Sequence, residues 1–162
     1  MFFRLKFHFG RRFAVLAVLT LAWSAVIFLF SAQNGDDSSG VSGKLLAIIC
    51  RIISYNPSPG MRSLLTLLLR KAAHMTEFGV LALLLLGTLR SGFGREGWTF
   101  PAAFAGSSCY AATDEFHQLF VSDRAGCVTD WLIDSSGALL FLLFGWLMMN
   151  YQRNYKKSHR KG

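Results

Sequence analysis

Residues 111–134 read AATDEFHQLFVSDRAGCVTDWLID and place a cluster of ionisable side chains between two strongly apolar segments. The polar and charged members of this cluster are Asp114, Glu115, His117, Gln118, Arg124, Asp130 and Asp134. Because a charge beside hydrocarbon is costly, ionisable residues next to membrane spans usually mark a functional site. A second polar piece, RKAAHMTE at residues 70–77, opens an earlier apolar segment. We expect the two pieces to meet at one end of a small membrane bundle.

The composition of the chain is that of a membrane protein. Hydrophobic residues make up 52% of the 162 residues, and this length fits a single domain over residues 1–162. The formal net charge is +8, but the basic residues cluster at the chain ends and in one short loop. That distribution favours cytoplasmic loops and anionic lipid head groups over nucleic acid as partners. The three cysteines, Cys50, Cys109 and Cys127, are too widely spaced for a disulfide framework or a metal signature.

The apolar runs predict an all-α integral membrane protein with four transmembrane helices. The expected spans cover about residues 12–33, 64–89, 98–120 and 130–149. Each is long enough to cross a hydrocarbon layer of about 30 Å as a helix. A cleaved signal peptide is the alternative for the first run, but its apolar stretch is too long and residues 30–32 (FSA) make a poor cleavage site. We therefore expect a retained membrane helix.

The segment between the first two spans is expected to combine a polar loop with one short amphipathic helix. Residues 31–43 (SAQNGDDSSGVSG) have the composition of a loop. In residues 44–55 (KLLAIICRIISY), helical spacing separates an apolar face from a polar face made of Lys44, Ala47, Arg51 and Ser54. The apolar face consists of Leu45, Ile48, Ile49, Ile52 and Tyr55. Too short to span, this helix is expected to lie at the membrane surface, or to pack over the bundle as a lid.

The distribution of basic residues predicts the orientation. With four spans and the N-terminus in the cytoplasm, 11 of the 17 Lys and Arg residues lie inside and 6 lie outside over longer segments. The positive-inside rule therefore places both termini in the cytoplasm. This topology brings the polar half of each span to the outer end of the bundle. The residues that converge there include six of the nine acidic residues, His74, His117, Lys71 and Arg124.

The same polar pieces resemble the VanZ-like family of small bacterial membrane proteins. The matching residues are FSAQ at 30–33, RKAAHMTEF at 70–78, DEFHQLF at 114–120, RAG at 124–126, Asp130, Asp134 and GA at 137–138. The resemblance covers about residues 23–145. It implies a multi-pass protein of the bacterial cytoplasmic membrane with a role in the cell envelope. The name-giving member of the family is associated with low-level teicoplanin resistance.

The favoured hypothesis is an enzyme that acts at the outer face on a phosphate-bearing lipid or a lipid-linked envelope precursor. Lys71 and Arg124 would hold anionic oxygens. His117 or His74 would serve as nucleophile or general acid/base, and His117 is slightly preferred because it has more polar neighbours. The carboxylates expected to tune the histidine are Asp114, Glu115 and Glu77. Further expected substrate contacts are Gln118, Asp130, Asp134 and Gln33.

Three alternatives remain open. A divalent metal site is one, although no cofactor is assumed; its candidate ligands are His74, His117, Glu77, Asp114 and Asp130. A non-catalytic binder or scaffold for a lipid-linked precursor or glycopeptide is the second. In the third, the charges form structural ion pairs between helix ends, such as Lys71 with Glu77 and Arg124 with Asp130. A transporter is disfavoured because no inverted repeat, broken helix or midplane charge is evident.

Overall fold

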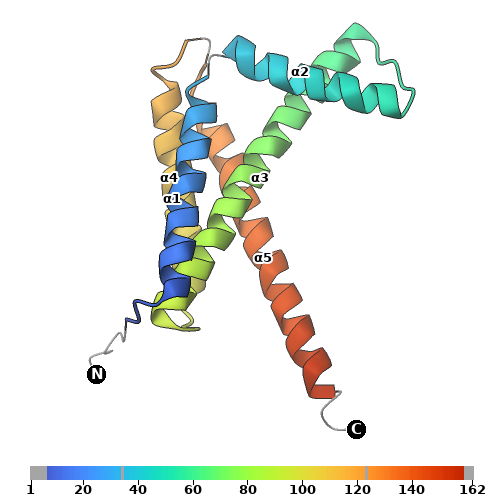
Figure 1. Ribbon diagram of the computed structural model, residues 1–162. Coiled ribbons are helices and arrows are strands. Elements are labelled where there is room, and N and C mark those ends of the chain that lie inside the picture. Colours follow the sequence, from blue (N-terminus) through green and yellow to red (C-terminus); the bar gives the residue numbers. More distant parts are fainter. Residues whose placement is uncertain (1–6, 34, 123, 159–162) are drawn as a thin grey trace.

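The protein is all-α, as predicted. A computed structural model describes residues 7–33, 35–122 and 124–158, so the predicted basic residues Arg4, Lys6, Arg160 and Lys161 lie outside the described ranges. The five helices within those ranges are α1 (Arg11–Ser31), α2 (Gly35–Ile52), α3 (Pro59–Phe93), α4 (Thr99–Gln118) and α5 (Val128–Ser158). Helices α1, α3, α4 and α5 form a bundle, and α2 lies across one end of it (Figure 1). Helix α3 is central and contacts each of the others.

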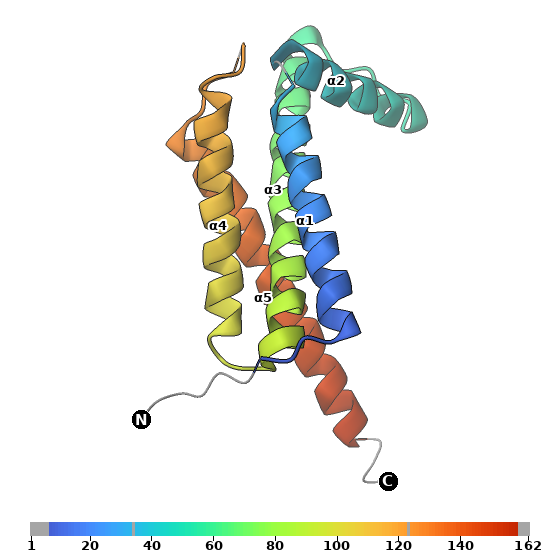
Figure 2. The same ribbon diagram turned by 60° about the vertical axis from the view of Figure 1, so that its left-hand side comes forward.

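Three helices are long and apolar enough to cross a membrane. They are α1 over Arg11–Ser31, α3 over Pro59–Phe93, and α5 over Val128–Lys156, as judged within the described ranges. The chain is therefore a multi-pass membrane protein. Helix α4 has 20 residues but is rich in Ala, Gly and Ser, and it packs against both α3 and α5. Figure 2 shows that α1 begins and α5 ends at the same end of the bundle, opposite α2.

Helix α3 is longer than the predicted span, and this changes the depth of the polar piece at residues 70–77. The helix begins at Pro59 rather than at residue 64, because Ser58 caps it by accepting a hydrogen bond from the Met61 amide at 3.4 Å and proline suits the first helical position. It ends at Phe93. The next residue, Gly94, has a φ of 81°, a backbone conformation that favours glycine. The polar piece thus lies about three turns inside the helix instead of opening it.

The predicted loop over residues 31–43 is wrong for most of its length, because α2 begins at Gly35. The contact of α2 with α3 supplies a tertiary stabilisation that overrides the weak helix propensity of this Gly- and Ser-rich sequence. Leu46 and Cys50 are its buried side chains. The helix predicted over residues 44–55 ends at Ile52, and the side chains of its predicted apolar face are exposed: Leu45, Ile48, Ile49, Ile52 and Tyr55.

Helix α5 also exceeds its prediction at both ends. It begins at Val128 and runs to Ser158, so the first part of the predicted basic tail is helical. Asp130 lies in its first turn, where the helix dipole favours a negative charge. The residues after Met149 include good helix formers such as Gln152 and Arg153, and nothing in that stretch breaks the helix.

Close contact between α3 and α5 sets the core of the bundle. A Cβ atom on Gly137 would lie 2.3 Å from the carbonyl oxygen of Met75, so only glycine fits at this crossing. A Cβ atom on Gly79 would meet the Phe141 ring at 2.4 Å. The buried apolar residues around these contacts are Ile27, Phe78, Leu81, Ala82, Leu86, Ala103, Ala111, Ala138 and Leu142. Small residues allow membrane helices to approach closely and to lock their relative rotation.

Candidate functional site

Polar side chains from α3, α4, α5 and the α4–α5 loop meet at the end of the bundle that carries α2. They surround a cavity of about 270 Å³. The lining residues are Arg70, Lys71, His74, Glu115, Gln118, Arg124, Ala125, Asp130, Ile133 and Asp134. The two polar pieces of the sequence are therefore adjacent in space.

One ion pair closes the α3–α5 side of the cavity. Lys71 Nζ contacts Asp130 Oδ1, and both side chains remain about one-third exposed. The pairs considered from the sequence, Lys71 with Glu77 and Arg124 with Asp130, are not the ones formed. The crossing of α3 and α5 brings Lys71 to Asp130, while Arg124 Nε donates to the main-chain oxygen of Gln33 at 3.2 Å.

Two guanidinium groups line the cavity without a carboxylate partner among the described residues. Within the described part of the chain, the hydrogen-bond partner of Arg124 is the Gln33 carbonyl oxygen, and Arg70 Nη1 donates to Ser39 Oγ at 3.3 Å. Burial lowers the pKa of the Arg124 guanidinium, and the nearby positive charge of Arg70 lowers it further. Arg70 had no role in the sequence prediction. Its position four residues before His74, on the same helix face, is the signal that could have identified it.

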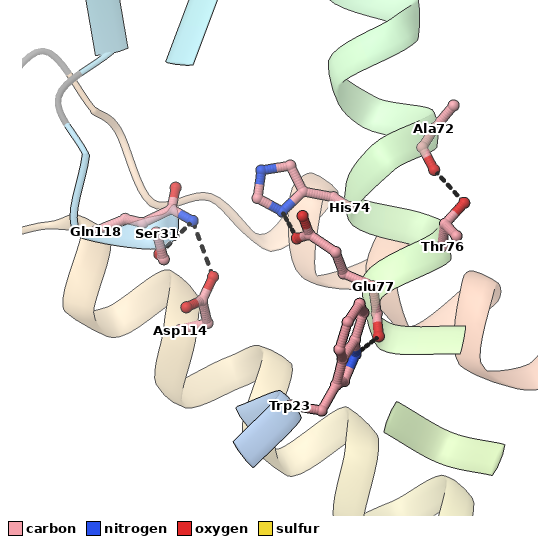
Figure 3. Close-up of polar contacts among 8 residues, drawn as sticks. All are labelled: Trp23, Ser31, Ala72, His74, Thr76, Glu77, Asp114 and Gln118. Atoms are coloured by element: carbon pink, nitrogen blue, oxygen red, sulfur yellow. Dashed lines mark hydrogen bonds and ion pairs between the residues drawn. The ribbon is translucent and has the colours of Figure 1, made fainter. Parts of the chain in front are cut away.

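His74 reaches the cavity from α3 with a carboxylate one turn away. Its Nδ1 lies 3.7 Å from Glu77 Oε2 and has no hydrogen-bond partner among the described residues. The main-chain oxygen of Glu77 accepts a 2.9 Å hydrogen bond from Trp23 Nε1 of α1, which anchors this turn of α3. Figure 3 shows His74 and Glu77 pointing from α3 toward Asp114 and Gln118 of α4.

His117 is placed differently. Its ring stacks on Phe28 of α1, with centroids 4.6 Å apart and planes inclined by 35°. It does not line the 270 Å³ cavity, whereas His74 does. The rotation of α4 turns His117, the histidine preferred from the sequence, toward α1, while His74 faces the cavity.

Gln118 connects α4 to the end of α1. Its Nε2 donates to Asp114 Oδ2 at 3.0 Å and to Ser31 Oγ at 3.2 Å, and all three side chains are buried (Figure 3). Asp114 is thus held by Gln118 and does not line the cavity. Because buried polar groups are costly unless paired, these bonds hold the α1–α4 contact in one arrangement.

Glu115 orders the turn that precedes α5. Its Oε2 accepts a 2.8 Å hydrogen bond from the Cys127 amide, immediately before the first residue of α5. The backbone of Glu115 also approaches Gly126 so closely that an added Cβ would lie 2.1 Å from the Glu115 carbonyl oxygen. A carboxylate that accepts from an amide at a helix start stabilises that start. This contact positions Arg124 and Asp130 on either side of the turn.

Asp134 is the deepest carboxylate of the cavity. Only 2% of its surface is exposed, and Oδ2 has no hydrogen-bond partner among the described residues. An unpaired buried carboxylate oxygen reduces stability, so native proteins keep such groups mainly where a ligand or a reaction uses them.

A smaller cavity of about 150 Å³ adjoins the first. Arg70, His74 and Arg124 line both cavities. The second cavity continues past Gln33 and Glu77 to the exposed apolar side chains of Phe30 and Val41. Arg70, His74 and Arg124 thus form a shared wall between a polar chamber and a partly apolar one.

A comparison with known families identifies the chain. The model of the VanZ/LLP1 family matches residues 16–150, a range that contains every residue of both cavities. The chain belongs to the VanZ/LLP1 family. No curated protein and no solved structure matches it significantly.

The VanZ/LLP1 chain brings most of the predicted site residues together. Within the described ranges, no group of three or more His, Cys, Asp and Glu side chains has the arrangement of a metal site. The proposed ligands His74 and His117 face different neighbours, the cavity and Phe28. The predicted residues that do line the VanZ/LLP1 cavities are Gln33, Lys71, His74, Glu77, Glu115, Gln118, Arg124, Asp130 and Asp134.

Proposed function

We propose that this VanZ/LLP1 protein is a membrane enzyme that acts at the outer face on a phosphate-bearing lipid or a lipid-linked envelope precursor. One observation carries the proposal: Arg70, His74 and Arg124 line both cavities, and the two guanidinium groups pair with no described carboxylate. Guanidinium groups bind phosphate oxygens strongly through paired, charge-assisted hydrogen bonds. A phosphate held between them would lie beside His74.

In the proposed reaction His74 is the general base, and the Glu77 carboxylate, 3.7 Å from His74 Nδ1, stabilises the imidazolium that forms. His74 takes a proton from the attacking hydroxyl, of water or of an acceptor alcohol, while that oxygen forms a bond to phosphorus. The ester bond to the departing oxygen breaks, and the departing oxygen takes up the proton from the imidazolium. Arg70 and Arg124 stabilise the charge on the remaining phosphate oxygens. The reaction class is therefore phosphoryl hydrolysis or transfer.

The lipid chain is proposed to leave the site through the smaller cavity. Phe30 and Val41 lie at its apolar end and are exposed. The exposed apolar face of α2 beside them would rest in the outer boundary of the bilayer. In the proposed topology α4 crosses the membrane in addition to α1, α3 and α5, which gives four spans. Both termini then lie in the cytoplasm and the cavities face outward. Close packing of the small residues of α4 against α3 and α5 supports its placement within the membrane.

The carboxylates of the larger chamber suggest which chemical groups the ligand carries besides its phosphate. Glu115, Asp130 and Asp134 line the larger chamber. Carboxylates accept hydrogen bonds from hydroxyl and ammonium groups, so a sugar or amino head group on the phosphate fits this chamber. The association of the family's name-giving member with teicoplanin resistance agrees with a substrate of the cell envelope, and a contribution to glycopeptide resistance is part of the proposal.

The test is an assay of purified protein in detergent with polyprenyl phosphate, polyprenyl diphosphate and phosphatidic acid, each resolved from its products by chromatography. His74→Gln should reduce turnover by at least about 100-fold, the usual scale of a lost general base. His117→Gln is the matched control and should retain most of the activity. No turnover of any of these lipids by the wild type, or an unchanged His74→Gln enzyme, would reject the proposed reaction.

A lipid or glycopeptide binder without catalysis is the second candidate. The 3.7 Å separation of His74 and Glu77 is longer than a hydrogen bond, which suits a binding site as well as a catalytic one. The binder predicts that lipid is retained on purification and released by Arg70→Gln or Arg124→Gln, with no product formed. The same chromatography separates the two candidates, because retained but unaltered lipid supports only the binder.

A further inference from the structure

The opposite end of the bundle holds a second basic cavity that the proposed function does not use. Its volume is about 310 Å³, and it lies among α1, α3, α5 and the turn after α3. Its basic residues are Arg12 of α1, Arg90 of α3 and Arg95 of the turn. Its walls include Leu83, Leu86 and Met149. Figure 2 shows this end of α1, α3 and α5 opposite the end that carries α2.

The charge of this cavity is not neutralised by the described residues. No acidic side chain lines it, and none of its three arginines forms an ion pair within the described ranges. Among the residues that the structure describes, Arg90 Nη1 has the Met149 sulfur as its partner at 3.3 Å, and the buried Arg90 Nε atom has no hydrogen-bond partner. A buried N–H group without an acceptor is unfavourable, so an anionic oxygen at this position would stabilise the structure.

Apolar side chains on and beside the cavity wall are exposed. Leu83 lies on its wall with 36% of its surface exposed, and Trp146, next to the lining residue Gly145, is 47% exposed. A ligand that suits both the arginine-lined part and the apolar part of the cavity has a phosphate group and a hydrocarbon chain. Basic pockets between membrane helices on the cytoplasmic side bind such lipids through their head groups.

We propose that this cavity binds an anionic phospholipid, with its phosphate among Arg12, Arg90 and Arg95 and an acyl chain against Leu83 and Met149. In the proposed orientation, with both termini in the cytoplasm, the site lies in the cytoplasmic leaflet. It is separate from the outer cavities and does not depend on the proposed reaction. The bound lipid would hold the ends of α1, α3 and α5 together.

The test compares wild-type protein with Arg12→Gln and Arg11→Gln in phosphatidylcholine nanodiscs that contain increasing fractions of phosphatidylglycerol. Arg11 and Arg12 are adjacent, exposed and equal in charge, but only Arg12 lines the cavity. Native mass spectrometry after detergent release counts the retained lipids. Arg12→Gln should lower phosphatidylglycerol retention about fivefold, the scale of one lost basic contact near a membrane surface, and Arg11→Gln should leave it unchanged.

Arg95→Gln provides an independent second variant, because Arg95 is exposed and its loss leaves the bundle core intact. It should reduce retention as Arg12→Gln does. Equal retention of phosphatidylcholine and phosphatidylglycerol by the wild type would overturn the proposal, as would equal effects of Arg11→Gln and Arg12→Gln. Thermal stabilisation by inorganic phosphate alone, equal to that by phosphatidylglycerol, would also overturn it, because it would show a simple anion site.

Discussion

The buried carboxylate of Asp134 in the candidate site lowers the stability of the fold. It is 2% exposed, has one unpaired oxygen, and shares its cavity with the carboxylates of Glu115 and Asp130. A buried charge without full compensation is unfavourable, and functional sites are where such cost is tolerated. His74 and Arg124 line the same cavity, and a ligand there could bridge them to Asp134.

Asp134→Asn should therefore raise the thermal unfolding midpoint in detergent by about 2–4 °C, the shift expected for about 1 kcal/mol in a chain of this size. The same substitution should reduce ligand retention or turnover. Asp130→Asn is the control one turn earlier on α5. It breaks the pair with Lys71 and should lower the midpoint slightly, since that pair is partly exposed. A lower midpoint for Asp134→Asn would show that its charge stabilises the fold.

At the scale of the elements, the crossing of α3 and α5 controls the geometry of the cavity. Gly137 touches the backbone of Met75, four residues after Lys71 on α3, and lies seven residues after Asp130 on α5. The pair between Lys71 and Asp130 forms one to two turns from that crossing. A small change in the distance between these two helices would alter the cavity as a whole.

Gly137→Ala should destabilise the protein by about 1–3 kcal/mol, because its Cβ would overlap backbone atoms that cannot move independently. Gly87→Ala is the control: its Cβ would lie 3.5 Å from a Leu16 side-chain atom, an ordinary contact, and alanine favours helix. Thermal unfolding of both variants in detergent measures the difference. Equal midpoints for the two would contradict the close packing of α3 on α5.

At the scale of the whole molecule, the adjoining cavities lined by Arg70 and Arg124 lie at one end of the bundle, and the cavity lined by Arg12, Arg90 and Arg95 lies at the other. The proposed orientation assigns the α2 end to the outer face and the ends of α1 and α5 to the cytoplasm. In that orientation, residues 119–127 connect α4 to α5 at the outer end, and residues 94–98 connect α3 to α4 at the inner end. Ser122 lies in the first connection and Gly97 in the second, and both residues are exposed.

Cysteine labelling in whole cells tests this orientation after Cys50, Cys109 and Cys127 are replaced by alanine. Ser122→Cys should react with a membrane-impermeant maleimide in intact cells. Gly97→Cys should react only after the membrane is permeabilised. The reverse pattern would invert the topology and place the histidine cavity in the cytoplasm. Labelling of both positions in intact cells would contradict the passage of α4 across the membrane.

The linear pattern of residues was sufficient to predict the helical class, the approximate positions of the apolar helices and the meeting of the two polar pieces. Apolar runs of this length form helices in a bilayer because the backbone has no other hydrogen-bonding partner there. Because α4 runs antiparallel to α3 and α5, the polar piece within α3 and the polar start of α5 come to lie beside the polar end of α4. The helix ends were less predictable, as α2 and α5 show, because residues of weak preference follow their tertiary contacts.

Only the tertiary structure decided which side chains face the cavity. Successive helical residues differ by about 100° in direction, so the rotation of a helix decides whether a given side chain faces the cavity or a neighbouring helix. That rotation depends on close contacts such as Gly137 with Met75, which link residues far apart in the chain. These contacts turn His74 into the cavity and His117 onto Phe28. The sequence thus determined which chemical groups gather at this end of the bundle, and packing between helices determined which of them can meet a ligand.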